Sequence, residues 1–141
     1  MKTLKIVYWV STAIVVLMMI YAAWSYLTNN QVKQAFIHLG FPGYFRIELA
    51  IAKIIGAVVL LAPFKRRIKE WAYVGFAIVF ISALIAHLSS GDPASVYIMP
   101  VIFLFILLVS YISYLKIGGN ATVETHGSEW QSKRHSFQQS I

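Results

Sequence analysis

With 141 residues, of which 59% are hydrophobic and 12% charged, and a mean hydropathy of +0.70, the chain is too apolar for a water-soluble domain and belongs in a lipid bilayer. It contains no cysteine, which excludes disulfide exchange, thiolate nucleophiles and thiolate-bound metals. The formal net charge of +7 does not indicate a nucleic-acid partner, because the basic residues flank apolar segments and are not interleaved with a stacking surface.

Four apolar segments are each close to the roughly 20 residues that a membrane-spanning helix requires. They cover residues 6–27, 44–62, 71–88 and 96–115. The first is too long for the apolar part of a secretory signal, so we interpret it as a retained span. Short connections make consecutive spans antiparallel neighbours. We therefore predict an all-α integral membrane four-helix bundle over residues 1–116, followed by a flexible polar cytoplasmic tail over residues 117–141.

Basic and aromatic residues mark the ends of the spans. The basic ones precede the first span, join the second to the third, or follow the fourth: Lys2, Lys5, Lys65, Arg66, Arg67, Lys69, Lys116, Lys133 and Arg134. By the positive-inside rule, these segments and both chain termini are cytoplasmic in a multi-pass protein of the cell membrane. Tyrosines and tryptophans near the span ends, among them Tyr8 and Tyr73, are typical of an interfacial aromatic belt.

The two outer connections carry turn and helix signals. Asn30 is a candidate helix cap, and apolar residues follow it at helical spacing, at Val32, Ala35, Phe36 and Leu39. This pattern predicts a short helix that lies in the membrane interface. The second outer connection, SSGDPAS, is very short and contains Gly91, which we expect to end the third span. The tight turn forces the third and fourth spans into contact.

The second span contains three charged residues, Arg46, Glu48 and Lys53. Lys53 lies roughly 13 Å below the outer interface, where burying a charge costs about 2.5–3.5 kcal/mol. It therefore needs a partner, water or a change of protonation state. At helical spacing, two rows of residues run along this span. One row contains Arg46, Ala50, Lys53 and Ala57, and the other contains Glu48, Ala52 and Gly56. Small residues allow a neighbouring helix to approach, so we predict that both rows face the interior and that Ile47, Ile51, Ile54, Ile55 and Val58 face lipid.

Depth along the spans brings more polar residues to the level of Glu48. His87 ends the third span, Asp92 lies just above it, and His38 comes from the outer loop. We predict an outward-facing ligand-binding pocket formed by Arg46, Glu48, Lys53, His87, Asp92 and His38, above an apolar wall that includes Phe76 and Phe80. The spans offer one histidine, so we do not expect bis-histidine haem ligation. No metal-binding motif is present, and catalytic residues and any other cofactor stay unassigned.

Two stretches within residues 39–93 resemble the DoxX-like family of small four-span membrane proteins. They are LGFPGYFRIELAIAKIIGAVVLLAP and RRIKEWAYVGFAIVFISALIAHLSSGDP. The resemblance rests on the pattern F-P-x-Y-F-R-x-E-L-x-x-A-K-x-x-G together with K-E-W-A-Y-x-G-F and A-H-L-x-x-G-D, whereas the first and fourth spans match only in character. It implies a membrane four-helix bundle. It implies redox association only loosely, because the family is named after a subunit of a quinone-linked sulfur oxidoreductase and most members have no established activity.

Several functions are compatible with this polar set. The first hypothesis is a pocket for a small amphipathic or quinone-like ligand, in which Lys53 and Glu48 orient polar atoms and His87 exchanges protons. The alternative is a non-enzymatic accessory or assembly subunit of a larger membrane complex, in which the polar residues only fix helix register. The third hypothesis, a solute or proton pathway, is the least favoured. Such a pathway needs polar groups in the inner halves of the spans, and the first, third and fourth spans offer only hydroxyl groups there. An enzyme acting on its own is the less favoured interpretation. The expected partners are the bilayer, a quinone or lipid ligand, and a membrane protein.

Overall fold

The computed structural model describes residues 2–139, apart from the side chains of residues 120–127, and this part of the chain is helical without strands. The helices are α1 (Lys2–Thr28), α2 (Asn30–His38), α3 (Gly43–Leu61), α4 (Arg66–Ser89) and α5 (Ala94–Gln139). The all-α prediction is confirmed, and so is the short helix between the first two predicted spans. The cap of α2 is Asn29, whose side chain accepts a hydrogen bond from the N–H of Gln31 at 2.8 Å, and not Asn30.

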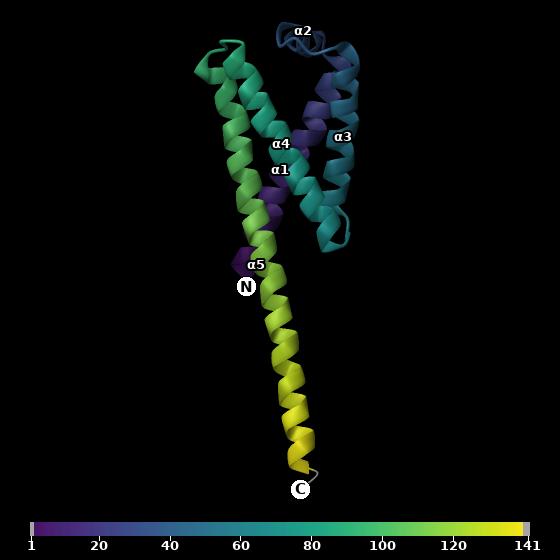
Figure 1. Ribbon diagram of the computed structural model, residues 1–141, viewed down its shortest axis with the longest axis vertical. Coiled ribbons are helices and arrows are strands. Elements are labelled where there is room, and N and C mark those ends of the chain that lie inside the picture. Colours follow the sequence, from purple (N-terminus) through teal and green to yellow (C-terminus); the bar gives the residue numbers. More distant parts are fainter. Residues whose placement is uncertain (1, 140–141) are drawn as a thin grey trace.

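The four longer helices pack in a ring. α1 packs against α3 and α5, and α4 packs against the same two helices. Within the described residues the backbone of α1 does not approach that of α4, nor the backbone of α3 that of α5, so these pairs lie diagonally opposite and meet only through side chains in the centre. The centre is an apolar core whose buried members include Val15, Met19, Leu60, Phe76 and Leu107. The N-terminus and the α3–α4 turn lie at one end, and α2 and the α4–α5 turn lie at the other (Figure 1). We call these the inner and the outer end.

Three helices are long and apolar enough to cross a membrane, judged by length and composition over the described residues: α1, α4 and the Ala94–Gly119 part of α5. α3 is not among them because its 19 residues include Arg46, Glu48 and Lys53. Five aliphatic residues of α3 were predicted to face lipid, and all are exposed on its surface: Ile47, Ile51, Ile54, Ile55 and Val58. Exposed apolar faces of this extent require a lipid environment.

α5 is longer than the sequence indicates. The predicted fourth span covers residues 96–115, yet the helix continues beyond the other helices to Gln139 (Figure 1). Residues 117–139 include three glycines but no proline, and extending an existing helix is far easier than starting one. The loss of apolar periodicity therefore ends the packed region without ending the helix. The flexibility of this segment stays a prediction.

Candidate functional site

The C-terminus of α4 brings two predicted site residues together. Gly91 adopts a left-handed conformation with φ of 71°. Its N–H donates to the carbonyl of Leu88 at 3.2 Å, and the N–H of Asp92 donates to the carbonyl of His87 at 3.1 Å. These two bonds form a Schellman motif, which folds the chain back over the helix end. As a result, Nδ1 of His87 lies 2.7 Å from Oδ2 of Asp92.

The C-terminus of α2 uses the same motif. Gly40 has φ of 78°, and the N–H of Phe41 donates to the carbonyl of Phe36 at 2.9 Å. The turn leaves His38 in the last turn of α2, where its Nε2 lies 3.3 Å from Oδ1 of Asp92. Asp92 therefore joins α2 to the α4–α5 turn. We call the set of His38, His87 and Asp92 the outer clasp.

The charge of Asp92 is favoured by its surroundings. The hydrogen bond from His87 lowers the pKa of Asp92, and the bond from His38 adds to this effect, while partial desolvation opposes it. Both histidines stand in the last turn of a helix, where the helix dipole favours a positive charge. The outer clasp is thus an electrostatic contact between two helix ends and one carboxylate.

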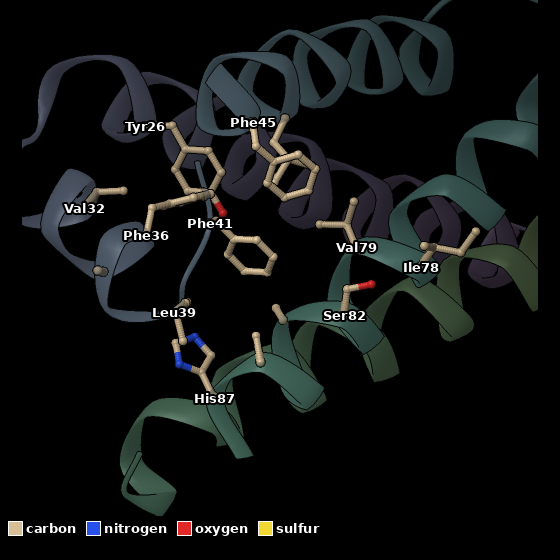
Figure 2. A pocket seen from close by; sticks show the side chains of 14 residues that line it. Tyr26, Val32, Phe36, Leu39, Phe41, Phe45, Ile78, Val79, Ser82 and His87 are labelled. Carbon is tan, nitrogen blue, oxygen red and sulfur yellow. The ribbon is translucent and has the colours of Figure 1, made fainter. Parts of the chain in front are cut away.

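A pocket of about 380 Å³ lies between α2, α3 and α4 (Figure 2). Its walls are mainly aromatic and aliphatic, and they include Phe36, Phe41 and Phe45. His87 and Ser82 are among its few polar lining residues, and His87 connects the pocket to the outer clasp. We call this space the outer pocket. An apolar cavity with a few convergent polar groups is the usual form of a small-molecule site.

A second cavity, of about 330 Å³, lies between α1, α4 and α5 and includes Lys53 in its wall. We call it the Lys53 cavity. It shares five lining residues with the outer pocket: Tyr26, Val32, Val79, Ala83 and His87. The two cavities are therefore adjacent and have a common wall.

Lys53 is the deep charge of the site. It is 4% exposed, and the neighbouring residues of its face, Ala50 and Ala57, are buried as predicted. Its Nζ lies 4.7 Å from the centre of the Tyr26 ring. Among the described residues it has no ion pair. A cation–π contact is worth about 0.5–2 kcal/mol, which is less than burying the charge costs.

The comparison with known families decides where the chain belongs. The model of the DoxX-like family matches residues 10–110. The protein belongs to the DoxX-like family. No curated protein and no solved structure matches the chain. The matched range includes both cavities, the outer clasp and Lys53, so the candidate site lies entirely within the family region of this DoxX-like protein.

Glu48 does not join the site of this DoxX-like protein. It is exposed, and no hydrogen bond or ion pair of the described residues involves it. The prediction that Glu48 faces the interior is wrong. Each residue of an α-helix is rotated by about 100° from the one before it, so Glu48, two residues after Arg46, points to nearly the opposite side of α3. Arg46 is half-buried, and its Nε has no hydrogen-bond partner. Ligand binding by the predicted residues stays a prediction.

A polar cluster at the inner end was missed by sequence analysis. Ser110 Oγ lies 2.7 Å from Thr12 Oγ1 and 2.8 Å from the hydroxyl of Tyr73. Tyr73 and Tyr8 are buried at 3% and 6% exposure, so assigning them to an interfacial belt is wrong.

Lys69, expected to be a topology signal, is also buried. Its Nζ donates to the carbonyl of Leu60 at 3.1 Å and satisfies a free carbonyl at the end of α3.

The two polar regions of the DoxX-like protein are separated by the apolar core. Along α4 the order is Tyr73, then Phe76 and Phe80, then Ala83 and His87. Phe76 and Phe80 are buried in the core cluster. The described residues therefore form no continuous polar path from one end to the other, and both cavities lie toward the outer end.

Proposed function

We propose that this DoxX-like protein crosses the membrane four times, with α3 as a span and both termini in the cytoplasm. Packing of α3 along α1 and α4 supports this, because it turns Lys53 inward and leaves the aliphatic residues of α3 outside. The inner end includes Lys5 and Lys65 near the N-terminus and the α3–α4 turn, as the positive-inside rule requires of a cytoplasmic side.

The absence of cysteine from the chain makes the topology testable. Gln34→Cys and Gln131→Cys place single thiols on the exposed surfaces of α2 and of the α5 extension. A membrane-impermeant thiol reagent applied to intact cells should label the first variant, and should label the second only after lysis. Labelling of Gln131→Cys in intact cells would contradict the proposed orientation.

We propose further that the two adjacent cavities bind a small amphipathic ligand. The observation that carries this proposal is a buried lysine that has no anionic partner among the described residues and lies in the wall of a cavity next to an aromatic-lined pocket. The apolar part of the ligand would occupy the outer pocket, and its polar part would lie next to Lys53. A quinone-like molecule fits this description, since a ring could pack among the phenylalanines while a carbonyl accepts a hydrogen bond from Lys53. That ligand would give the protein a redox association.

The outer clasp would control entry. α2 supplies Val32 and Phe36 to the outer pocket, and its C-terminal His38 is held to Asp92. This hydrogen bond is long, at 3.3 Å, and His38 is exposed. Of the two bonds in the clasp, the His38 bond is the weaker and would open first. Opening it would free the end of α2 without disturbing the His87–Asp92 pair.

Ligand binding is tested by native mass spectrometry of the protein in lipid nanodiscs, with palmitic acid and a decyl-substituted benzoquinone as separate probes. Ala83→Phe fills the wall common to both cavities. Ile85→Phe adds a phenylalanine to the same helix at a residue that is 58% exposed and lines neither cavity. Wild type and Ile85→Phe should retain at least one probe, and Ala83→Phe should lose it. Equal binding by all three proteins would contradict the proposal.

The α5 extension supports a second candidate function, that of an accessory subunit. Beyond Gly119 the helix runs past the other helices (Figure 1), and Trp130 is 67% exposed. A protruding helix with an exposed tryptophan is suited to contact a protein partner. If this is the function, a chain ending at Gly119 should lose a membrane protein that co-purifies with the full chain. Unchanged co-purification would contradict it.

A further inference from the structure

We infer that the ligand is acidic: an amphiphile with one hydrocarbon chain and a compact anionic head, such as a carboxylate, that binds next to the ammonium group of Lys53. The inference rests on the proposed amphiphile site and adds the charge of the ligand to it. It depends on three features of the structure. These are the positions of the carboxylates, the charges on the inward face of α3, and the composition of the cavity walls.

No carboxylate of the described residues forms an ion pair with Lys53. There are five acidic residues: Glu48, Glu70, Asp92, Glu124 and Glu129. Glu48 is exposed, on a different face of α3. Glu70 accepts a hydrogen bond from Nε of Arg66 at 2.9 Å at the inner end. Asp92 is held in the outer clasp. The last two belong to the α5 extension, where the side chain of Glu124 lies outside the described residues.

The inward face of α3 has two cations and no anion. Arg46 and Lys53 are seven residues apart and share this face, about 10 Å apart along the helix axis. The Nε of Arg46 is buried and has no hydrogen-bond partner. The ring of Tyr26 is the one cation–π contact of Lys53 among the described residues, and it supplies no negative charge. The electrostatic potential at the Lys53 cavity is therefore positive, which favours an anion.

The cavity walls limit the size and chemistry of the head group. Beside Lys53 the wall is formed mainly by apolar side chains such as Met19, Phe80 and Phe103. Besides Lys53, its polar lining residues are Tyr21, Ser25, Tyr26, Asn29 and His87. These scattered side chains include no carboxylate that could pair with the cation of a zwitterionic head, which would lie near Lys53 as a second positive charge. A neutral carbonyl would accept a hydrogen bond and leave the charge uncompensated, whereas a carboxylate would accept the same bond and also compensate the positive charge of Lys53.

A pair of ligands that differ only in charge tests this inference. Palmitate and methyl palmitate have the same acyl chain, and the ester lacks the anionic oxygen. Dissociation constants are measured in nanodiscs for the full-length wild type, Lys53→Met and Lys53→Arg. We expect wild type and Lys53→Arg to bind palmitate at least about tenfold more tightly than the ester. We expect Lys53→Met to bind the two ligands with equal affinity.

The outcomes separate the inference from the proposed function. If wild type binds the acid and the ester equally, and Ala83→Phe abolishes both, then the ligand is not acidic while the amphiphile site stands. If wild type binds neither, both proposals fail. The wild-type comparison alone decides the charge of the ligand, so it holds even if Lys53→Met does not fold. Displacement of palmitate by an equal concentration of acetate would show that the hydrocarbon chain does not contribute, and would also overturn the inference.

Discussion

The ammonium of Lys53 lies 4.7 Å from the centre of the Tyr26 ring, and no acidic side chain of the described region lies within ion-pair distance of it. The ring attracts the cation without neutralising it. Tyr26 also lines both the outer pocket and the Lys53 cavity. A molecule in the Lys53 cavity therefore meets both residues, and a molecule in the outer pocket meets Tyr26. The stability of the empty protein should reflect the uncompensated charge of Lys53.

Lys53→Met should leave the ligand-free protein as stable as wild type or more stable, by up to about 2 kcal/mol. Methionine has a similar volume and removes a buried charge, while the loss of the cation–π contact offsets part of the gain. The free energy of unfolding, measured in detergent by circular dichroism, checks this. Destabilisation by more than about 2 kcal/mol would mean that Lys53 has a structural partner instead.

Two glycines in the facing helices α3 and α4 should respond differently to alanine. A Cβ at Gly56 would lie 2.6 Å from a ring carbon of Phe76, whereas a Cβ at Gly75 would meet no atom within 4 Å. Gly56→Ala should destabilise the protein by about 1–3 kcal/mol, because it overpacks the α3–α4 contact. Gly75→Ala is the matched control and should be neutral or stabilising by up to about 1 kcal/mol. Equal unfolding free energies for both variants would show that α3 and α4 are not so closely packed.

The hydroxyl cluster at the inner end should show measurable coupling. Ser110 connects Tyr73 and Thr12 through hydrogen bonds of 2.8 and 2.7 Å. A double-mutant cycle of Ser110→Ala and Tyr73→Phe isolates the first bond. We expect a coupling free energy of about 0.6–1.7 kcal/mol, as for other hydrogen bonds between membrane helices. Additive effects of the two substitutions would mean that this bond contributes nothing to stability.

Acidification should weaken the outer clasp through Asp92. Hydrogen bonds from His87 and His38 hold the pKa of Asp92 below its usual value of 3.8. The stabilisation that Asp92 provides is therefore complete above that value and is lost as the pH falls through the lowered pKa. Between pH 5 and pH 3, the unfolding midpoint of wild type should fall more steeply than that of Asp92→Asn. Glu48→Gln, at an exposed residue without a partner, should follow wild type. Parallel curves for wild type and Asp92→Asn would contradict the clasp.

Much of the fold could be predicted from sequence because the apolar pattern follows helical geometry closely. On α3 it identifies both the buried face of Ala50, Lys53 and Ala57 and the exposed isoleucines. The prediction for Glu48 was wrong although helical geometry would have corrected it. Glu48 lies about 140° around the helix from Lys53, so the two side chains cannot share one face. The expectation that Gly91 ends the third span is confirmed. The hydrogen bonds that Asp92 forms with His87 and His38 after this turn could not be predicted from the glycine alone.

The remaining features depend on contacts between helices distant in sequence. The burial of Tyr73 requires a hydroxyl partner on α5, Ser110, which no local pattern reveals. The contact of Lys69 with the end of α3 and the shared wall of the two cavities are likewise consequences of packing. Sequence therefore identifies the inward face of α3 apart from Glu48, and the structure shows which buried polar residues of the other helices meet.

The most direct test of the amphiphile site is photo-crosslinking with a diazirine-labelled palmitic acid in nanodiscs, with the labelled peptides mapped by mass spectrometry. The label should concentrate on residues that line the two cavities, such as Val79 and Ala83. Ala83→Phe should reduce this labelling, and Ile85→Phe should not. Labels spread over the lipid-facing residues, with the same pattern in all three proteins, would show that the cavities do not hold the ligand.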